Sequence, residues 1–159
     1  MPTSTYIPLQ TITLGSAASS VTFASIPQTY RDLVLVMNYG ASNATNSGKA
    51  FVNGDTTAAN YKSVRMQGNS SSAVSNTNGE SIRWEVQATS GLVTTLQFMD
   101  YSATDKHKTV LVRANAASTA TEASANRWTS TSAITSIAIN FLGTDLTTGS
   151  TLSLYAIEA

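Results

Sequence analysis

The chain has no cysteine, a single histidine and few charged residues. The absence of cysteine excludes disulfides, thiolate metal sites and thiol nucleophiles. Charged residues make up 11% of the 159 residues, less than half of the roughly 25% that is usual in soluble domains. Nine Lys and Arg balance nine Asp and Glu, so the sequence lacks the basic face that nucleic acid or an anionic membrane surface would require.

Long apolar runs are missing as well. No stretch approaches the roughly 18 consecutive apolar residues of a membrane span. Residues 1–5 contain no basic segment of the kind that opens an export signal. We therefore expect no membrane partner.

The polar part of the chain consists mainly of hydroxyl side chains, with 22 Ser and 24 Thr. This composition would suit a disordered chain, but 42% of the residues are apolar and aromatic residues occur along the whole length. The chain can therefore bury a core. Its length fits one domain, which we place at residues 1–159, with residues 1–11 as either an extended N-terminal arm or a strand.

Apolar residues recur with a period of two, which is typical of strands with one buried face. The clearest case is residues 82–88, where apolar side chains alternate with Arg83, Glu85 and Gln87. Residues 33–37 are apolar on both faces and predict a central strand, covered on one side by a second sheet and on the other by a neighbouring subunit. About ten strands are predicted, at residues 6–14, 20–26, 33–39, 49–53, 61–67, 82–88, 92–101, 107–114, 133–141 and 150–158.

Gly-, Asn- and Ser-rich segments separate these strands. Asn53-Gly54 is the strongest hairpin signal, because both residues tolerate the positive φ of a type I′ turn. Residues 68–79 are too polar for the core and predict a surface loop or a segment ordered by a partner. For residues 114–126 a long loop is favoured over a short helix, since hydroxyl and β-branched residues interrupt any helical stripe.

Short strands joined in this way predict an all-β fold with little helix. A two-sheet antiparallel jelly-roll-like β-sandwich of about 8–10 strands is favoured over an up-and-down barrel. The long connections at residues 41–48, 68–79 and 114–126 suit crossings between sheets better than tight hairpins.

Residues for catalysis are scarce. His107 lies between Lys106 and Lys108, which oppose its protonation and repel a metal ion, so it is expected to be a polar residue at the start of a strand. No Gly-x-Ser-x-Gly segment exposes a nucleophile. Glu80 and Glu85 are not expected to form the pair of carboxyl groups that glycoside hydrolysis requires. Glu85 is expected to form a surface ion pair with Arg83 instead.

Four aspartates adjoin turn residues, and we expect their side chains to cap backbone N–H groups. An oxygen-lined Ca²⁺ site built from two such loops is the alternative, although no Asp-x-Asp-x-Asp spacing occurs. We predict no catalytic, metal or cofactor-binding residue. The four aspartates beside turn residues are Asp55, Asp100, Asp105 and Asp145.

Aromatic residues are the other candidates for binding. Trp84 is expected in the core, because it lies on the apolar face of its strand. Trp128 is the best candidate for an aromatic residue at a rim or interface, although burial in the core is the favoured alternative. A carbohydrate-binding module would expose Trp128 or Tyr61.

Several short segments, in their order and spacing, resemble small virion structural proteins of tailed bacteriophages, including phages of cyanobacteria. The likeness runs from about residue 6 to the C-terminus. Its segments are Ser20-Val21-Thr22-Phe23, Ile26-Pro27, Tyr30-Arg31-Asp32-Leu33-Val34-Leu35, Phe51-Val52-Asn53-Gly54-Asp55, Asn60-Tyr61, Asp100-Tyr101-Ser102, Lys106-His107-Lys108-Thr109-Val110-Leu111, Gly149-Ser150-Thr151, Ser153-Leu154-Tyr155 and Ile157.

The resemblance implies a jelly-roll module without enzyme activity that assembles, often as a homotrimer, on a virion. We expect a capsid decoration or cement protein whose partner is the major capsid protein. The alternative is a receptor- or glycan-binding module of a head or tail fibre, with a host glycan as partner. The N-terminal end or the segment 68–79 would reach the shell, and the predicted partner-binding residues are Pro2, Tyr6, Ile7, Pro8, Leu9 and Trp128.

Overall fold

The computed structural model describes residues 5–44, 47–68, 71–85, 88–116, 120–141 and 143–158. These residues form two packed antiparallel sheets and one short 3₁₀ helix, Ala58–Asn60. In spatial order, the larger sheet contains β1 (Tyr6–Thr13), β12 (Thr151–Ile157), β3 (Asp32–Tyr39), β8 (Leu92–Met99), β9 (Lys108–Ala116), β10 (Ala120–Trp128), β5 (Tyr61–Gly68) and β6 (Ala73–Asn78). The smaller sheet contains β2 (Ser20–Phe23), β11 (Ile137–Phe141), β4 (Ser47–Val52) and β7 (Ile82–Glu85).

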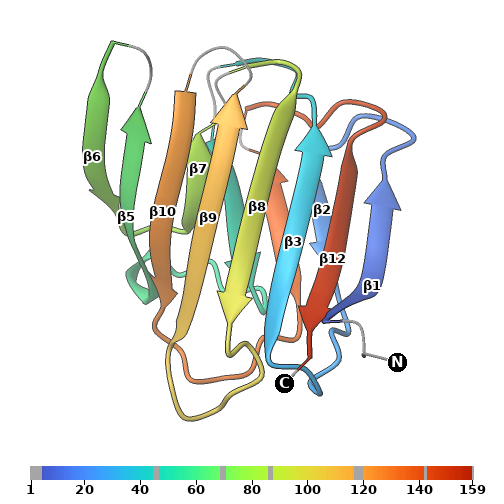
Figure 1. Cartoon of the computed structure of the whole chain (residues 1–159), viewed down its shortest axis with the longest axis vertical. Helices are drawn as coiled ribbons and strands as arrows, with labels where there is room; N and C mark the ends of the chain where they lie inside the picture. Colours follow the sequence, from blue (N-terminus) through green and yellow to red (C-terminus); the bar gives the residue numbers. More distant parts are fainter. Residues whose placement is uncertain are drawn as a thin grey trace.

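The chain crosses between the two sheets at most of its connections. Figure 1 shows the larger sheet in front and the smaller sheet behind it. In the smaller sheet the late strand β11 lies between the early strands β2 and β4, which is the wrapping of a jelly roll. The predicted all-β antiparallel sandwich is confirmed.

The period-two pattern located most of the strands. The segment predicted to be central forms β3, which lies between β12 and β8. Its residues Leu33, Leu35 and Met37 are fully buried between the sheets, and Val34 on the other face is almost buried. The prediction of a central strand is therefore confirmed, whereas cover from a neighbouring subunit stays a prediction.

Two loop predictions were wrong. Most of residues 114–126 belongs to the end of β9 and to β10, which pair from Ala120↔Ala116 to Trp128↔Lys108. The sheet overrides the weak local preference, because alternate side chains of β10 are buried along its length. Within residues 68–79 the chain forms β6, which among the described strands pairs with β5 alone.

The turn prediction at Asn53-Gly54 was right in its backbone and wrong in its consequence. Asn53 and Gly54 have φ values of 53° and 69°, and the Asp55 N–H donates to the Val52 carbonyl across the turn at 2.9 Å. The chain then enters the larger sheet instead of folding back beside β4. The Asn53 side chain explains this, since it bonds the distant backbone of Ala133, Thr135 and Ser136.

The core fills the space between the sheets around Trp84. As predicted, Trp84 is fully buried, and its Nε1 donates to the Tyr39 hydroxyl at 2.9 Å. Phe141 packs edge-on against both rings, with centroid distances of 5.4 Å to Tyr39 and 5.9 Å to Trp84. Gly48 lies directly under the indole, where a Cβ atom would collide with the ring.

The larger sheet extends beyond the smaller one at its β6 end. In the smaller sheet the last strand on this side is β7, and Figure 1 shows β5 and β6 beyond it. The described side chains of β6 from Ala73 to Thr77 are all exposed. We call the β5–β6 pair the overhang.

Candidate functional site

The outward face of the larger sheet is apolar near the overhang. Burial alternates along β5, so that Ser63 faces inward while Val64 and Met66 face outward with 53% and 62% of their surface exposed. Val93 on β8 is 40% exposed. Isolated exposed apolar residues are ordinary, but several on the same face of one sheet indicate an interaction surface.

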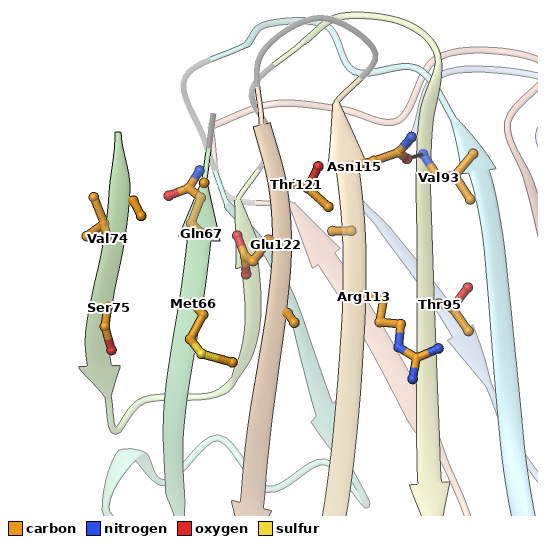
Figure 2. A pocket seen from close by; sticks show the side chains of 14 residues that line it. Met66, Gln67, Val74, Ser75, Val93, Thr95, Arg113, Asn115, Thr121 and Glu122 are labelled. Carbon is orange, nitrogen blue, oxygen red and sulfur yellow. Dashed lines mark hydrogen bonds between the residues drawn. The ribbon is translucent and has the colours of Figure 1, made fainter. Parts of the chain in front are cut away.

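Strands β5, β6, β8, β9 and β10 line a groove of about 920 Å³. Figure 2 shows it from close by, with Met66 on one side, Val93 and Thr95 on the other, and Arg113 between them. Its lining residues come from five neighbouring strands, and they are Met66, Gln67, Gly68, Ala73, Val74, Ser75, Val93, Thr95, Arg113, Ala114, Asn115, Thr121, Glu122 and Ala123. A second hollow of about 550 Å³ lies on β5, β6, β9 and β10, with Lys62, Val64 and Arg127 in its lining. We call the outward surface of β6, β5, β10, β9 and β8 the groove face.

A cluster of four charged side chains lies on the inner side of the same strands. Arg65 Nη1 is 2.5 Å from Glu85 Oε1 and 3.5 Å from Glu122 Oε2. Arg83 Nη2 donates to Glu85 Oε1 at 2.9 Å. The expected pair of Arg83 and Glu85 is present, but it is partly buried, because Arg65 and Glu122 of the larger sheet pack over β7.

Glu122 is the most buried member of this cluster, with 5% of its surface exposed. Desolvation raises the pKa of its carboxyl group to about 7, while a bond from the Glu85 N–H and the charge of Arg65 oppose this shift. The cluster joins β5 and β10 to β7 and therefore braces the overhang from below. Glu122 was not among the predicted residues, because residues 114–126 were expected to form a long loop and no strand pattern marked the buried positions.

The two aromatic candidates for a binding surface are buried. Trp128 is 3% exposed and Tyr61 is 1% exposed, so the favoured alternative of core burial was right for Trp128, and neither residue is exposed as a glycan-binding module would require. Asp55 explains the placement of the indole, since its Oδ2 accepts a bond from Trp128 Nε1 at 2.7 Å and one from Asn60 at 2.8 Å. The bond from Trp128 is the main reason that the pKa of Asp55 falls to about 2.

The predicted N-terminal contact residues lie at the opposite edge of the larger sheet from the overhang. Pro2 falls outside the described residues. From Tyr6 onward the segment is strand β1, paired with β12, and not a free arm. Tyr6 and Pro8 are exposed, whereas Ile7 and Leu9 pack against the core. The structure thus does not bring these residues together with Trp128 or with the groove.

The residues considered for chemistry are dispersed. His107 is exposed just before β9. Of the four turn aspartates, Asp55 caps a backbone group, accepting a bond from the Thr57 N–H at 2.9 Å. Asp100 and Asp105 each have a carboxylate oxygen 3.8 Å from Lys106 Nζ. In the described part of the chain no three His, Asp or Glu side chains are grouped so that they could hold a metal ion.

Among the described residues the only helix is the short 3₁₀ helix Ala58–Asn60. None of them forms a helix that is long and apolar enough to cross a bilayer. The fold and the groove face define an all-β sandwich with an exposed apolar surface on one sheet. Comparison with known proteins adds no relative, since no protein-family model and no curated protein matches the chain.

Proposed function

We propose that this chain is a structural protein of a bacteriophage virion, most specifically a decoration or cement protein that binds the major capsid protein on the head as a homotrimer. The observation that carries the proposal is the groove face, where apolar side chains stay exposed on a well-packed jelly roll. The resemblance of the sequence to small virion proteins of tailed phages supports the same proposal. No catalytic step is part of it.

A cement protein acts through binding free energy. Surface that it buries across neighbouring capsid subunits must be exposed again before the shell can open, so each contact opposes the internal pressure of the genome. Burial of apolar surface contributes about 25 cal/mol for each Å², before the costs of association are subtracted. In a trimer three copies of the contact act at high effective concentration, so individually weak contacts hold firmly.

The alternative, a glycan-binding module of a fibre, has less support in the site. Sugar-binding surfaces commonly use exposed aromatic rings, and none of the residues that line the groove is aromatic. Trp128 and Tyr61, which this alternative would expose, belong to the core. We therefore keep the capsid as the proposed partner.

The test is immunogold labelling of purified virions of the encoding phage with an antibody against this chain. Gold distributed over heads is expected, and gold on tails alone would favour a fibre module. Absence from the particle would overturn the virion proposal. Sedimentation velocity of the purified protein tests the homotrimer separately, because it distinguishes one, two and three copies by mass.

A further inference from the structure

The positively charged side chains of the chain differ in whether they have a partner within the described residues. Five of its nine cations, Arg31, Lys49, Arg65, Arg83 and Lys106, form ion pairs within the described chain. Lys108 is buried and donates to the carbonyls of Lys106 and Thr131. The three that remain, Lys62, Arg113 and Arg127, have no ion pair with any described residue.

These three cations share one surface. Lys62 is on β5, Arg113 on β9 and Arg127 on β10, and each is exposed at an outward position of its strand. Arg113 lines the larger hollow, and Lys62 and Arg127 line the smaller one. The described outward positions of β5, β6, β8, β9 and β10 contain no Asp or Glu, although the chain as a whole is neutral. The groove face therefore combines exposed aliphatic side chains with three positive charges that nothing in the described chain neutralises.

The β6 edge of the larger sheet, beside this face, also lacks features that would prevent pairing with a strand of another chain. At the other end of the larger sheet β1 contains Pro8 and an irregularity in its pairing between Pro8 and Gln10. Both features blunt the edge against pairing with another chain. The end strand β6 has neither a proline nor a charged residue, and its described pairing is regular from Ser63↔Asn78 to Gly68↔Ala73.

We propose that the groove face binds a protein surface in which carboxylates alternate with aliphatic side chains. This inference rests on the proposed structural function and names the chemistry that the capsid partner would present. Arg113 would bind a carboxylate in the middle of the groove, while Met66 and Val93 pack against the partner's aliphatic groups. Charge decides against a second copy seated face to face, because three cations would then oppose three cations with no acid between them.

The test is an NMR titration of the whole chain with a short soluble peptide in which glutamate alternates with valine. Matched peptides carry lysine or serine in place of glutamate. We expect saturable shifts of the amide signals of Met66, Val93 and Arg113 with the glutamate peptide, and at least about tenfold weaker binding of the lysine peptide. Raising the salt from about 0.05 M to about 0.5 M should weaken the glutamate complex several-fold, because the shorter Debye length screens exposed charges.

Two variants sharpen the result. Arg113→Glu should weaken binding of the glutamate peptide at least about tenfold without affecting folding, because Arg113 is exposed. The control is Lys106→Glu, which reverses a charge outside the groove face on a side chain that is 51% exposed. This control should leave the affinity unchanged.

The proposal is overturned if the lysine peptide binds as well as the glutamate peptide, if the shifts lie elsewhere, or if neither peptide binds. Shifts of the groove signals that depend on protein concentration alone would assign the face to a second copy instead. The outcome is separate from the labelling of virions. If virion heads are labelled but the glutamate peptide is not preferred, the proposed function is retained and the inference about the groove is wrong. If the groove binds the glutamate peptide but the protein is absent from virions, the inference about surface chemistry is retained and the proposed function is wrong.

Discussion

The centre of the larger sheet and the overhang are built from the same alternating pattern and serve different ends. At the centre, β3 and β8 bury Leu35, Met37 and Leu96 completely against the smaller sheet. In the overhang, Val64, Met66 and Val74 keep about half or more of their surface exposed. Val64 and Met66 point to the outward face of the larger sheet, which the smaller sheet does not cover, and Val74 lies on β6, beyond the last strand of the smaller sheet.

This contrast separates stability from binding. A buried aliphatic side chain contributes roughly 1.5–3 kcal/mol by leaving water, whereas the exposed residues of the overhang contribute little to folding and keep their apolar surface available for a partner. Substitutions at buried central positions should therefore destabilise the domain, and those at the exposed apolar positions of the overhang should mainly alter association.

The largest effect is expected from Gly48→Ala in the covered region. The added Cβ would collide with the indole of Trp84, which is itself held by Tyr39 and Phe141. The free energy of unfolding should fall by roughly 3 kcal/mol, at the upper end of overpacking penalties. Urea denaturation measures this loss. Gly15→Ala is the control, because a Cβ there meets nothing, and an equal loss in both variants would contradict the explanation.

The next effect concerns the brace beneath the overhang and depends on pH. The pKa of Glu122 is about 7 in the folded state against an ordinary 4.5, so between these values the folded chain keeps a proton that the unfolded chain releases. The free energy of unfolding should therefore decrease as the pH rises from about 4.5 to 7, by about 2.5 kcal/mol.

Denaturation of Glu122→Gln as a function of pH tests this expectation. The variant should have a flatter profile over that window, while the exposed Glu158→Gln should keep the wild-type slope. An unchanged slope in Glu122→Gln would show that another group causes the pH dependence.

A smaller effect is expected from Asp55→Asn at the end of the core. One carboxylate oxygen accepts the bonds of both Trp128 and Asn60, and an amide group cannot satisfy both of these donors and Thr57. A loss of about 1–2 kcal/mol is expected, because at least one of these N–H donors would lose its acceptor. Near-ultraviolet circular dichroism and urea denaturation measure it. Asp105→Asn, with a side chain 75% exposed, should change neither signal.

The smallest change in stability is expected from Met66→Ser in the overhang. This residue is 62% exposed, so the free energy of unfolding should stay within about 0.5 kcal/mol of the wild type. Binding to virion heads or to the glutamate peptide should nevertheless weaken, because Met66 lines the groove. A large loss of stability would mean that the overhang belongs to the folding core and would remove the contrast on which the groove proposal depends.

The N-terminal segment has a local pattern that does not decide its structure. Its alternation allowed either an arm or a strand, and only pairing with β12 decides for the strand. Deletion of residues 2–9 is expected to lower the free energy of unfolding, because Ile7 and Leu9 pack against the core. Trp128 posed the same problem, since the acceptor that holds its indole, Asp55, is far away in the sequence.

The sequence by itself determined the all-β class, the central place of β3, the burial of Trp84 and the positive-φ turn at Asn53-Gly54. These features depend on period-two patterning and on the backbone freedom of individual residues, which are local properties. The tertiary structure decided that β10 is a strand, that Glu122 lies buried beside Arg65, and that three cations share one face. Such features depend on which strands become neighbours and on where the smaller sheet ends, and long-range pairing decides both.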